Sequence, residues 1–255
     1  MNIFLVQYDV IWHKPSENFK KIINFLQHEH LKDSIVVLPE MFNTGYSLQH
    51  SDIVSSSMEI TKQFMSDFSK KNKCIIVGSI PFKEGNKLYN RLLAYSNGKK
   101  IAQYDKRHLF SNANEDKLYS PGKEIIVFNY QNIKIKPAIC YDLRFPVWLR
   151  NKENYDLLII VANWPAKRLQ VWETLLKARS IENQCFVVGV NRVGTDKNGF
   201  VYNGNSMFID PKGEIIAKCT DKEEICKVEF DKKELEEFRK KFDTLKDADN
   251  FNILL

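Results

Sequence analysis

The sequence predicts an α/β protein in which two mixed β-sheets pack face to face and helices cover their outer sides. Three observations support this fold class. Several predicted strands are apolar at every position, which indicates sheets that are covered on both faces. These strands alternate with helical segments, but hairpins interrupt the alternation too often for a doubly wound parallel sheet. The 255 residues, 44% of them apolar, contain no Pro/Gly/Ser-rich linker, so we expect one domain over residues 1–255.

The first third of the chain is typical of a β-α-β-α-β unit. Apolar residues at helical spacing, such as Phe19, Ile22 and Leu26, give the first helix an inner face. The predicted elements are a strand over residues 2–9, a helix over 16–31, a strand over 35–38, a helix over 58–71 and a strand over 74–78.

Antiparallel pairing is predicted in the middle of the chain, because Asn97-Gly98 is a strong signal for a two-residue hairpin. A turn at residues 210–213, with the sequence Asp-Pro-Lys-Gly, predicts a second hairpin. The further strands cover residues 88–95, 100–105, 125–130, 133–139, 157–161, 185–191 and 226–230. The further helices cover residues 145–151, 169–182 and 231–242.

Composition and charge argue against several classes of function. The net charge of +6 comes from 38 basic and 32 acidic residues spread along the chain, without the basic block that nucleic-acid binding requires. The longest wholly apolar run, Leu157–Ala162, is too short to span a bilayer. The first residues lack the basic leader of a signal peptide. Five cysteines, an odd number, then predict reduced thiols and a cytoplasmic location.

Three chemically active side chains directly follow predicted strands, and we expect them to share one pocket. They are Glu40, Lys106 and Cys140. A thiol at a strand-to-helix turn lies near free backbone N–H groups and the positive end of a helix dipole, which favour the thiolate. A partly buried carboxyl has a raised pKa, which suits a general base. The pattern therefore predicts a cysteine nucleophile with an acid and an ammonium beside it.

Other chemistries lack the motifs that they need. No CxxC or HExxH is present and the histidines are scattered, so we expect no metal and no cofactor. Serine-hydrolase, dinucleotide and nucleoside-triphosphate motifs are also missing from the sequence. A Cys–His protease would need a histidine beside the thiol, and His108 is a candidate only because it is near Lys106. The other four cysteines are interpreted as small core residues.

Several motifs, spread over nearly the whole chain, resemble those of the nitrilase (carbon–nitrogen hydrolase) superfamily and follow one another in the family's order. Two of them, Lys106-Arg107-His108-Leu109-Phe110 and Cys140-Tyr141-Asp142-Leu143-Arg144-Phe145-Pro146, look most like the omega-amidase branch. The others are Leu38-Pro39-Glu40-Met41-Phe42, Gly78-Ser79-Ile80, Tyr89-Asn90, Ser120-Pro121-Gly122, Ala162-Asn163-Trp164-Pro165 and Asn191-Arg192-Val193-Gly194.

The resemblance implies a fold, a set of roles and an assembly. The family's fold is an α-β-β-α sandwich, and it usually forms homodimers, to which the segment of about residues 243–255 would contribute. Its roles fall on Cys140 as nucleophile, Glu40 as general base and acid, and Lys106 as the cation at the oxyanion. Glu115 matches the further glutamate that orients the lysine and the substrate. The omega-amidase branch hydrolyses the terminal amide of 2-oxo acids such as 2-oxoglutaramate and 2-oxosuccinamate.

An omega-amidase substrate carries a carboxylate, which needs a cationic or hydroxyl partner in the pocket. We expect this partner among Arg168, Arg144 and Tyr46, with Phe42 and Trp164 as apolar walls and the Tyr141 N–H at the oxyanion. An N-carbamoyl-amine or short aliphatic amide hydrolase is the alternative within enzymes. A catalytically silent binding protein is the alternative outside them, and the intact trio of Glu40, Lys106 and Cys140 argues against it.

Overall fold

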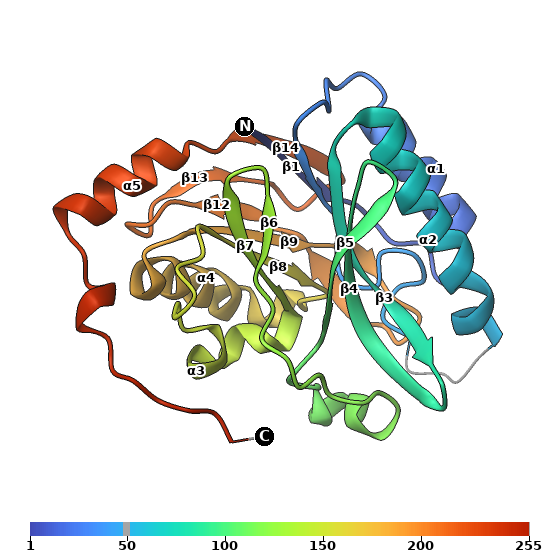
Figure 1. The fold of residues 1–255 in the computed structure, drawn as a ribbon. Coiled ribbons are helices and arrows are strands. Elements are labelled where there is room, and N and C mark those ends of the chain that lie inside the picture. The colour runs from blue at the N-terminus through green and yellow to red at the C-terminus, as the bar shows by residue number, and fades with distance from the viewer. Residues whose placement is uncertain (48–51, 255) are drawn as a thin grey trace.

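Two six-stranded sheets form the framework of the computed structural model, which describes residues 1–47 and 52–254 (Figure 1). The first sheet runs in the order β14 (Glu224–Glu229), β1 (Asn2–Gln7), β2 (Ile35–Val37), β3 (Ile75–Glu84), β4 (Lys87–Ser96) and β5 (Lys99–Asp105). The second runs β13 (Ile215–Lys218), β12 (Met207–Ile209), β9 (Phe186–Asn191), β8 (Leu157–Ala162), β7 (Ile133–Ile139) and β6 (Phe128–Tyr130). In each sheet a parallel trio, β1-β2-β3 or β7-β8-β9, is extended on both sides by antiparallel strands. The predicted mixed sheets are confirmed.

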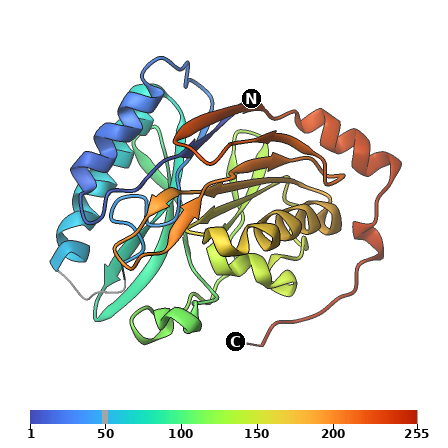
Figure 2. The same ribbon diagram turned by 180° about the vertical axis from the view of Figure 1, so that it is seen from behind.

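Helices cover the outer faces of the two sheets (Figures 1 and 2). These are α1 (Pro15–Leu26), α2 (Asp52–Asn72), α3 (Pro146–Leu149) and α4 (Leu169–Asn183), whereas α5 (Lys232–Lys241) lies at the margin of the molecule. The first two lie against the first sheet, whereas α3 and α4 lie against the second, as the predicted sandwich requires. In the described residues, no helix is both long enough and apolar enough to cross a membrane.

The core lies on both faces of each sheet because successive residues of a strand point to opposite faces. Ile3 and Leu5 of β1 join the large cluster that lies between the sheets and continues beneath α3 and α4. Phe4 and Val6 of the same strand join a second cluster beneath α1 and α2. Strands that are apolar at every position therefore lie in sheets covered on both faces, which confirms the prediction.

Several element boundaries differ from the sequence prediction. Helix α1 ends at Leu26 rather than near residue 31, and α2 begins at Asp52 rather than near residue 58. Strand β3 continues to Glu84 because it pairs with β4 along its whole length. The hairpin at Asn97-Gly98 forms as predicted, with both residues at positive φ, as a type I′ turn requires.

Cys219 and Cys226 form a disulfide, so the expectation of five reduced thiols is wrong for this pair. Cys219 directly follows β13 of the second sheet and Cys226 lies within β14 of the first, and the reversal between these strands brings their Cα atoms to 5.9 Å. Cys74, Cys140 and Cys185 are free. Cys74 and Cys185 are fully buried in the core, in agreement with their interpretation as small apolar residues.

Candidate active site

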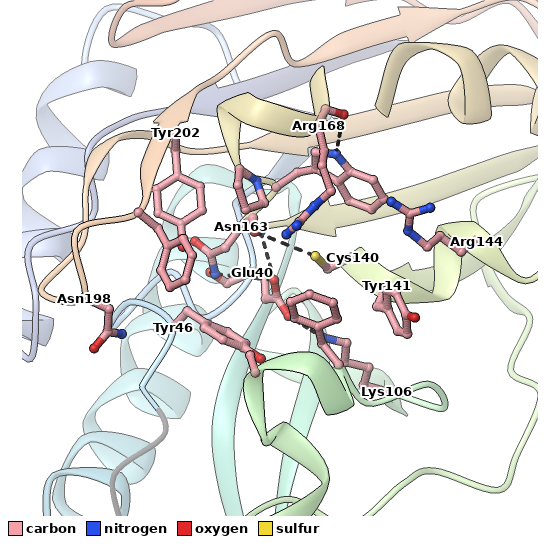
Figure 3. Close-up of a pocket in the computed structure, with 15 residues that line it drawn as sticks. Glu40, Tyr46, Lys106, Cys140, Tyr141, Arg144, Asn163, Arg168, Asn198 and Tyr202 are labelled. Carbon is pink, nitrogen blue, oxygen red and sulfur yellow. Dashed lines mark hydrogen bonds and ion pairs between the residues drawn. The ribbon is translucent and has the colours of Figure 1, made fainter. Parts of the chain in front are cut away.

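A pocket of about 610 Å³, including its open mouth, lies where strands of the two sheets end together. Glu40 follows β2 and Lys106 follows β5 in the first sheet, while Cys140 follows β7 in the second. All three line the pocket, and Figure 3 shows them at its centre. The prediction that these three strand ends share one pocket is confirmed.

Glu40 is fully buried, and donors surround its carboxylate. Oε1 accepts hydrogen bonds from Lys106 Nζ at 2.9 Å and from Asn90 Nδ2 at 2.7 Å. Oε2 accepts one from the backbone N–H of Asn163 at 2.8 Å. Because all of these partners donate, the arrangement suits an ionised carboxylate held in one orientation.

Lys106 lies between two buried carboxylates. Its Nζ is 2.9 Å from Glu40 Oε1 and 2.9 Å from Glu115 Oε2. Burial alone would lower the pKa of Lys106, but the facing carboxylates Glu115 and Glu40 outweigh it and raise that pKa well above its usual value. Lys106 is therefore a permanent cation, and Glu115 holds it in place.

Close packing fixes the backbone at Lys106. Its N–H donates to the carbonyl of Asn90 at 2.9 Å, and its carbonyl accepts from the N–H of Gly122 at 2.9 Å. A side chain at position 122 would bring Cβ within 2.1 Å of the carbonyl oxygen of Asp105. Only glycine fits this close approach, which explains the glycine of the Ser120-Pro121-Gly122 motif.

Cys140 has a strained backbone and a protonated thiol. Its φ is +46°, a left-handed conformation that is rare for a residue with a side chain. Burial of the sulfur raises its pKa well above the usual value, the charge of Glu40 raises it further, and Lys106 lowers it. The predicted helix dipole is not available, because the chain after Ile139 forms only a five-residue 3₁₀ helix, Cys140–Arg144. The expectation of a thiolate stabilised by a helix is therefore wrong.

The structure brings together most of the residues that the sequence suggested for substrate binding. Tyr46, Tyr141, Arg144, Trp164 and Arg168 all line the pocket. The hydroxyl of Tyr46 is buried and has no hydrogen-bond partner among the described residues.

Two predicted neighbours lie elsewhere. Phe42 is fully buried in the core beneath α1 and α2, where its ring packs against Phe19 and Gly78, so the prediction that it forms a pocket wall is wrong. His108 does not face the thiol as a Cys–His pair would require, because its Nδ1 lies 2.8 Å from Asp142 Oδ1. Its ring stacks on Phe145.

Arg144 and Arg168 differ from every other arginine of the chain. Neither guanidinium has a hydrogen bond or ion pair within the described residues, whereas all the other arginines donate to a carboxylate or a carbonyl. Arg144 lies over the ring of Trp164 at 5.2 Å and Arg168 over the ring of Phe110 at 5.3 Å. In Figure 3 the Arg168 side chain descends toward Cys140 from above, and the Arg144 side chain enters from the right. The pocket thus offers two unpaired cations to an anionic ligand.

Sequence reasoning missed several residues of the site. Asn90 and Asn163 bind the Glu40 carboxylate, and both lie in motifs of the family resemblance, Tyr89-Asn90 and Ala162–Pro165. A hairpin outside both sheets, β10 (Val193–Thr195) and β11 (Val201–Asn203), was also missed. It brings three further residues to the pocket, namely Asn198, Phe200 and Tyr202.

The arrangement can transfer a proton from a neutral thiol to a fixed carboxylate beside a permanent cation. That is the equipment for nucleophilic attack on an acyl carbon. In the part of the chain that the structure describes, no three His, Cys, Asp or Glu side chains form a group that could hold a metal ion.

An α-β-β-α sandwich whose pocket joins a thiol, a carboxylate and an ammonium defines the nitrilase class of hydrolases. The family model described as "Carbon-nitrogen hydrolase" matches residues 3–240, and the chain belongs to this family. The chain is 38% identical to omega-amidase YafV of Yersinia enterocolitica, with 100% of this chain and 99% of the relative covered. It is 36% identical to a 2-oxoglutaramate amidase of Bacillus subtilis, with 93% of each covered. These relatives confirm the resemblance to the omega-amidase branch.

Solved structures agree with the fold. A CN-hydrolase superfamily protein of Xanthomonas campestris, which carries an arsenic adduct in its active site, matches with a TM-score of 0.93 and 34% identity. The match covers 99% of this chain and 98% of that one. Nit3 of Saccharomyces cerevisiae, a member of the nitrilase superfamily, matches with a TM-score of 0.84 at 26% identity, covering 96% and 94%. The predicted α-β-β-α sandwich is confirmed.

Proposed function

We propose that this protein is an omega-amidase, which hydrolyses the terminal amide of a small 2-oxo acid amide to the dicarboxylate and ammonia. The observation that carries the proposal is the pair of unpaired guanidiniums, Arg144 and Arg168, in the pocket that holds Cys140. An amide without a carboxylate would leave both cations without a partner in a partly buried site. Relatives named omega-amidase and 2-oxoglutaramate amidase support the same substrate class.

The first half of the reaction forms a thioester. Glu40 accepts the proton of the Cys140 thiol while the sulfur attacks the amide carbon, and Lys106 with the Tyr141 N–H stabilises the oxyanion. Each such donor contributes about 3 kcal/mol to the transition state in comparable sites. Protonated Glu40 then gives the proton to the leaving nitrogen, the C–N bond breaks and ammonia departs. Glu115 keeps Lys106 oriented through both contacts to Nζ.

The second half releases the acid. Glu40, again a carboxylate, removes a proton from water, and the oxygen of that water attacks the thioester carbon. The C–S bond breaks, the sulfur takes back a proton through Glu40, and the dicarboxylate leaves. One carboxylate serves both halves because Asn90, Asn163 and Lys106 hold it in a fixed orientation. No step of this scheme requires a metal or an organic cofactor.

The 2-oxo carboxylate end of the substrate binds at Arg144 and Arg168, on the side of Cys140 away from Glu40 and Lys106 (Figure 3). It presents several oxygens in one plane, which two planar guanidiniums can meet with parallel N–H donors. Trp164 and Phe110 support the two guanidiniums by ring stacking. Burial, followed by the nearby Glu115, raises the pKa of Tyr46, so its unpartnered hydroxyl is available as a donor to the substrate.

The experiment is ammonia release from a matched set of amides. The set contains 2-oxoglutaramate, 2-oxosuccinamate, glutamine, an N-carbamoyl-amine and a short aliphatic amide. We expect kcat/KM for a 2-oxo amide to exceed that for the aliphatic amide by at least about 100-fold. Cys140→Ala should abolish release, and Arg168→Ala should raise KM for 2-oxosuccinamate about 10-fold or more.

The same set separates the alternatives. Equal or better turnover of the N-carbamoyl-amine or the aliphatic amide would assign the protein to that class of amide hydrolases instead. No release from any member would support a catalytically silent binding protein. An unchanged KM in Arg168→Ala would leave Arg144 and Tyr46 as the candidates for the carboxylate.

We also propose that the protein is one cytoplasmic domain that works as a homodimer, with residues 243–255 at the subunit interface. Apolar side chains on this stretch and just before it support the proposal, since Phe242 is 62% and Leu254 94% exposed. Ile253 packs on the core of its own chain, and the carbonyl of Phe251 accepts from Lys152 Nζ at 2.6 Å. These contacts hold the segment beside α3. Residue 255 lies outside the described residues.

A further inference from the structure

A fully buried carboxylate joins the turn that carries Cys140 to the loop that carries Lys106. This carboxylate is Asp142, two residues after the cysteine. Its Oδ2 accepts from the N–H of Ile139 at 3.1 Å and from the Tyr104 hydroxyl at 2.8 Å. Its Oδ1 accepts from His108 twice, from the backbone N–H at 2.9 Å and from Nδ1 at 2.8 Å. An ionised carboxylate can accept all four bonds, and His108 then carries its proton on Nδ1.

Ring contacts reinforce the same connection. The His108 ring stacks on Phe145 with centroids 3.7 Å apart and meets the edge of Trp148 at 5.9 Å. Both aromatic residues belong to the segment that follows Cys140. The Tyr104 hydroxyl also accepts a hydrogen bond from Trp148 Nε1 at 2.9 Å. Hydrogen bonds and ring contacts therefore both link the segment that follows Cys140 to the loop that carries Lys106.

The proposed reaction needs such a connection because its groups come from different sheets. Lys106 follows β5 of the first sheet, and Cys140 follows β7 of the second. Cys140 also has its φ at +46°, which persists only where the surroundings hold it. Asp142 fixes the N–H of Ile139, the residue immediately before this position. A misplacement of about 1 Å in a catalytic site can cost about 100-fold in rate.

We propose that Asp142 and His108 are positioning residues that fix Lys106 relative to Cys140, and that they control kcat rather than substrate binding. Neither lines the pocket, so neither is expected to touch the substrate. The proposal rests on the proposed function for the roles of Lys106 and Cys140. In this proposal the Asp142–His108 pair holds the end of β5 and the end of β7 at the separation that the reaction requires.

The first test is Asp142→Asn. Whichever way the amide is turned, its NH₂ group faces either the N–H of Ile139 or the N–H of His108, and two donors cannot bond to each other. We expect kcat to fall at least about 100-fold while KM changes less than about 3-fold. Asp156→Asn is the matched control, because Asp156 is a buried carboxylate that accepts a backbone N–H at the opposite end of β7 and β8. The control should keep wild-type kcat in its folded fraction.

A second pair of variants keeps the proposal testable if Asp142→Asn does not fold. His108→Asn places an N–H near the position of Nδ1, and His108→Ala removes that donor and the ring. We expect His108→Ala to lose about 10-fold or more in kcat and His108→Asn to recover part of the loss. Equal kcat in wild type, His108→Ala and Asp142→Asn, or a loss shared equally by Asp156→Asn, would overturn the proposal.

Alkylation of Cys140 by iodoacetamide separates this proposal from the proposed function. Lys106 lowers the pKa of the Cys140 thiol, so moving Lys106 away should leave less thiolate. The alkylation rate at Cys140, measured by mass spectrometry at pH 8, should fall at least about 5-fold in Asp142→Asn but not in Asp156→Asn. This result needs no amide substrate and holds even if no amide in the set is hydrolysed. An unchanged or faster rate in Asp142→Asn contradicts the positioning role.

Discussion

Besides burial, three charged groups act on the pKa of the Cys140 thiol: the carboxylates of Glu40 and Glu115 and the ammonium of Lys106. Glu40 and Glu115 raise the pKa of the thiol, and Lys106 lowers it, while burial gives the largest upward shift. A thiolate is therefore unfavourable in the resting site. The thiol loses its proton to Glu40 only as the sulfur attacks the substrate. The arrangement favours transfer of the proton at the moment of attack over a nucleophile that is ionised in advance.

This charge balance predicts the pH dependence of Cys140 alkylation. Because the folded pKa is raised well above its usual value, the alkylation rate should still be increasing above pH 9 instead of levelling off there. Glu40→Gln removes a charge that raises the pKa and should move the profile to lower pH. Lys106→Met removes the charge that lowers it and should move the profile to higher pH. Rates from pH 6 to 10, followed by mass spectrometry, measure these shifts.

The other free thiols provide an internal control. Burial raises the pKa of both Cys74 and Cys185 to about 12, and both are fully buried in the core. They should label more slowly than Cys140 at every pH at which the protein stays folded. A wild-type profile for Cys140 that levels off below pH 7 would show that burial and the two carboxylates do not dominate the pKa of this thiol.

The sequence could place a single residue in the site only where that residue directly follows a predicted strand. Glu40, Lys106 and Cys140 each follow a strand, and strand ends are visible in the apolar pattern. Phe42 could not be placed, because Met41 adopts a φ of +47° that sends the next side chain back into the core. The partners Asn90 and Asn163 lie far from Glu40 in sequence, and only the packing of strands shows that they donate to it.

Strand β7 carries a charged residue in its buried stretch. Lys136 is 2% exposed, and its Nζ lies 3.3 Å from Glu153 Oε2 and 3.4 Å from the carbonyl of Arg150. Burial lowers the pKa of Lys136, and Glu153 offsets only part of that shift. A lysine in this position costs stability whenever it is protonated in the folded state.

We predict that Lys136→Met raises the free energy of unfolding by about 1–2 kcal/mol at pH 7. The unfolded lysine binds a proton up to a pKa of about 10.4, and the folded one loses it at lower pH, so wild-type stability rises with pH within that window. The advantage of Lys136→Met should therefore shrink as the pH approaches 10. Urea unfolding at pH 7 and pH 9.5 measures both effects.

Lys134→Met on the same strand is the matched control, since Lys134 is exposed to solvent. It should change stability by less than about 0.5 kcal/mol at either pH. If Lys136→Met is less stable than wild type at pH 7, the ion pair with Glu153 contributes more than burial costs, and the interpretation of Lys136 is wrong.

Whole elements were predictable where a regular pattern extends over several residues. The apolar runs predicted the parallel trios, and Asn97-Gly98 predicted the β4–β5 hairpin. The β10–β11 hairpin could not be seen, because each of its strands has only three residues and follows no apolar pattern. It forms because Asp196 holds the turn through hydrogen bonds to the N–H groups of Asn198 and Phe200. This hairpin completes one side of the pocket.

The relation between the two sheets is a property of the whole molecule. The alternation of strands and helices predicted two packed sheets, and the large apolar cluster between them stabilises that arrangement. Which strand ends meet depends on how the two sheets pack, which local sequence patterns do not contain. Hydrogen bonds from Asn163 of the second half to Glu40 of the first show how the packing completes the site.

The surface near the end of the chain predicts self-association. Phe242 and Leu254 expose apolar side chains, and in a two-fold symmetric dimer each substitution would act twice. We expect the double variant Phe242→Asp, Leu254→Asp to weaken the dimer at least about 100-fold, because four buried charges would replace apolar contacts. Sedimentation velocity at micromolar concentration should show a dimer for wild type and a monomer for the variant.

Ile23→Asp on α1 is the control for this prediction. Ile23 is 46% exposed, and α1 covers the first sheet, away from the C-terminal segment (Figure 1). The control should sediment like wild type, and both variants should keep wild-type thermal unfolding in the monomer if these side chains stabilise only the assembly. A monomeric wild type, or a double variant that remains a dimer, would show that residues 243–255 fold back on their own subunit alone. The contacts of Lys152 with Phe251 and of Ile253 with the core would then hold this segment to its own subunit.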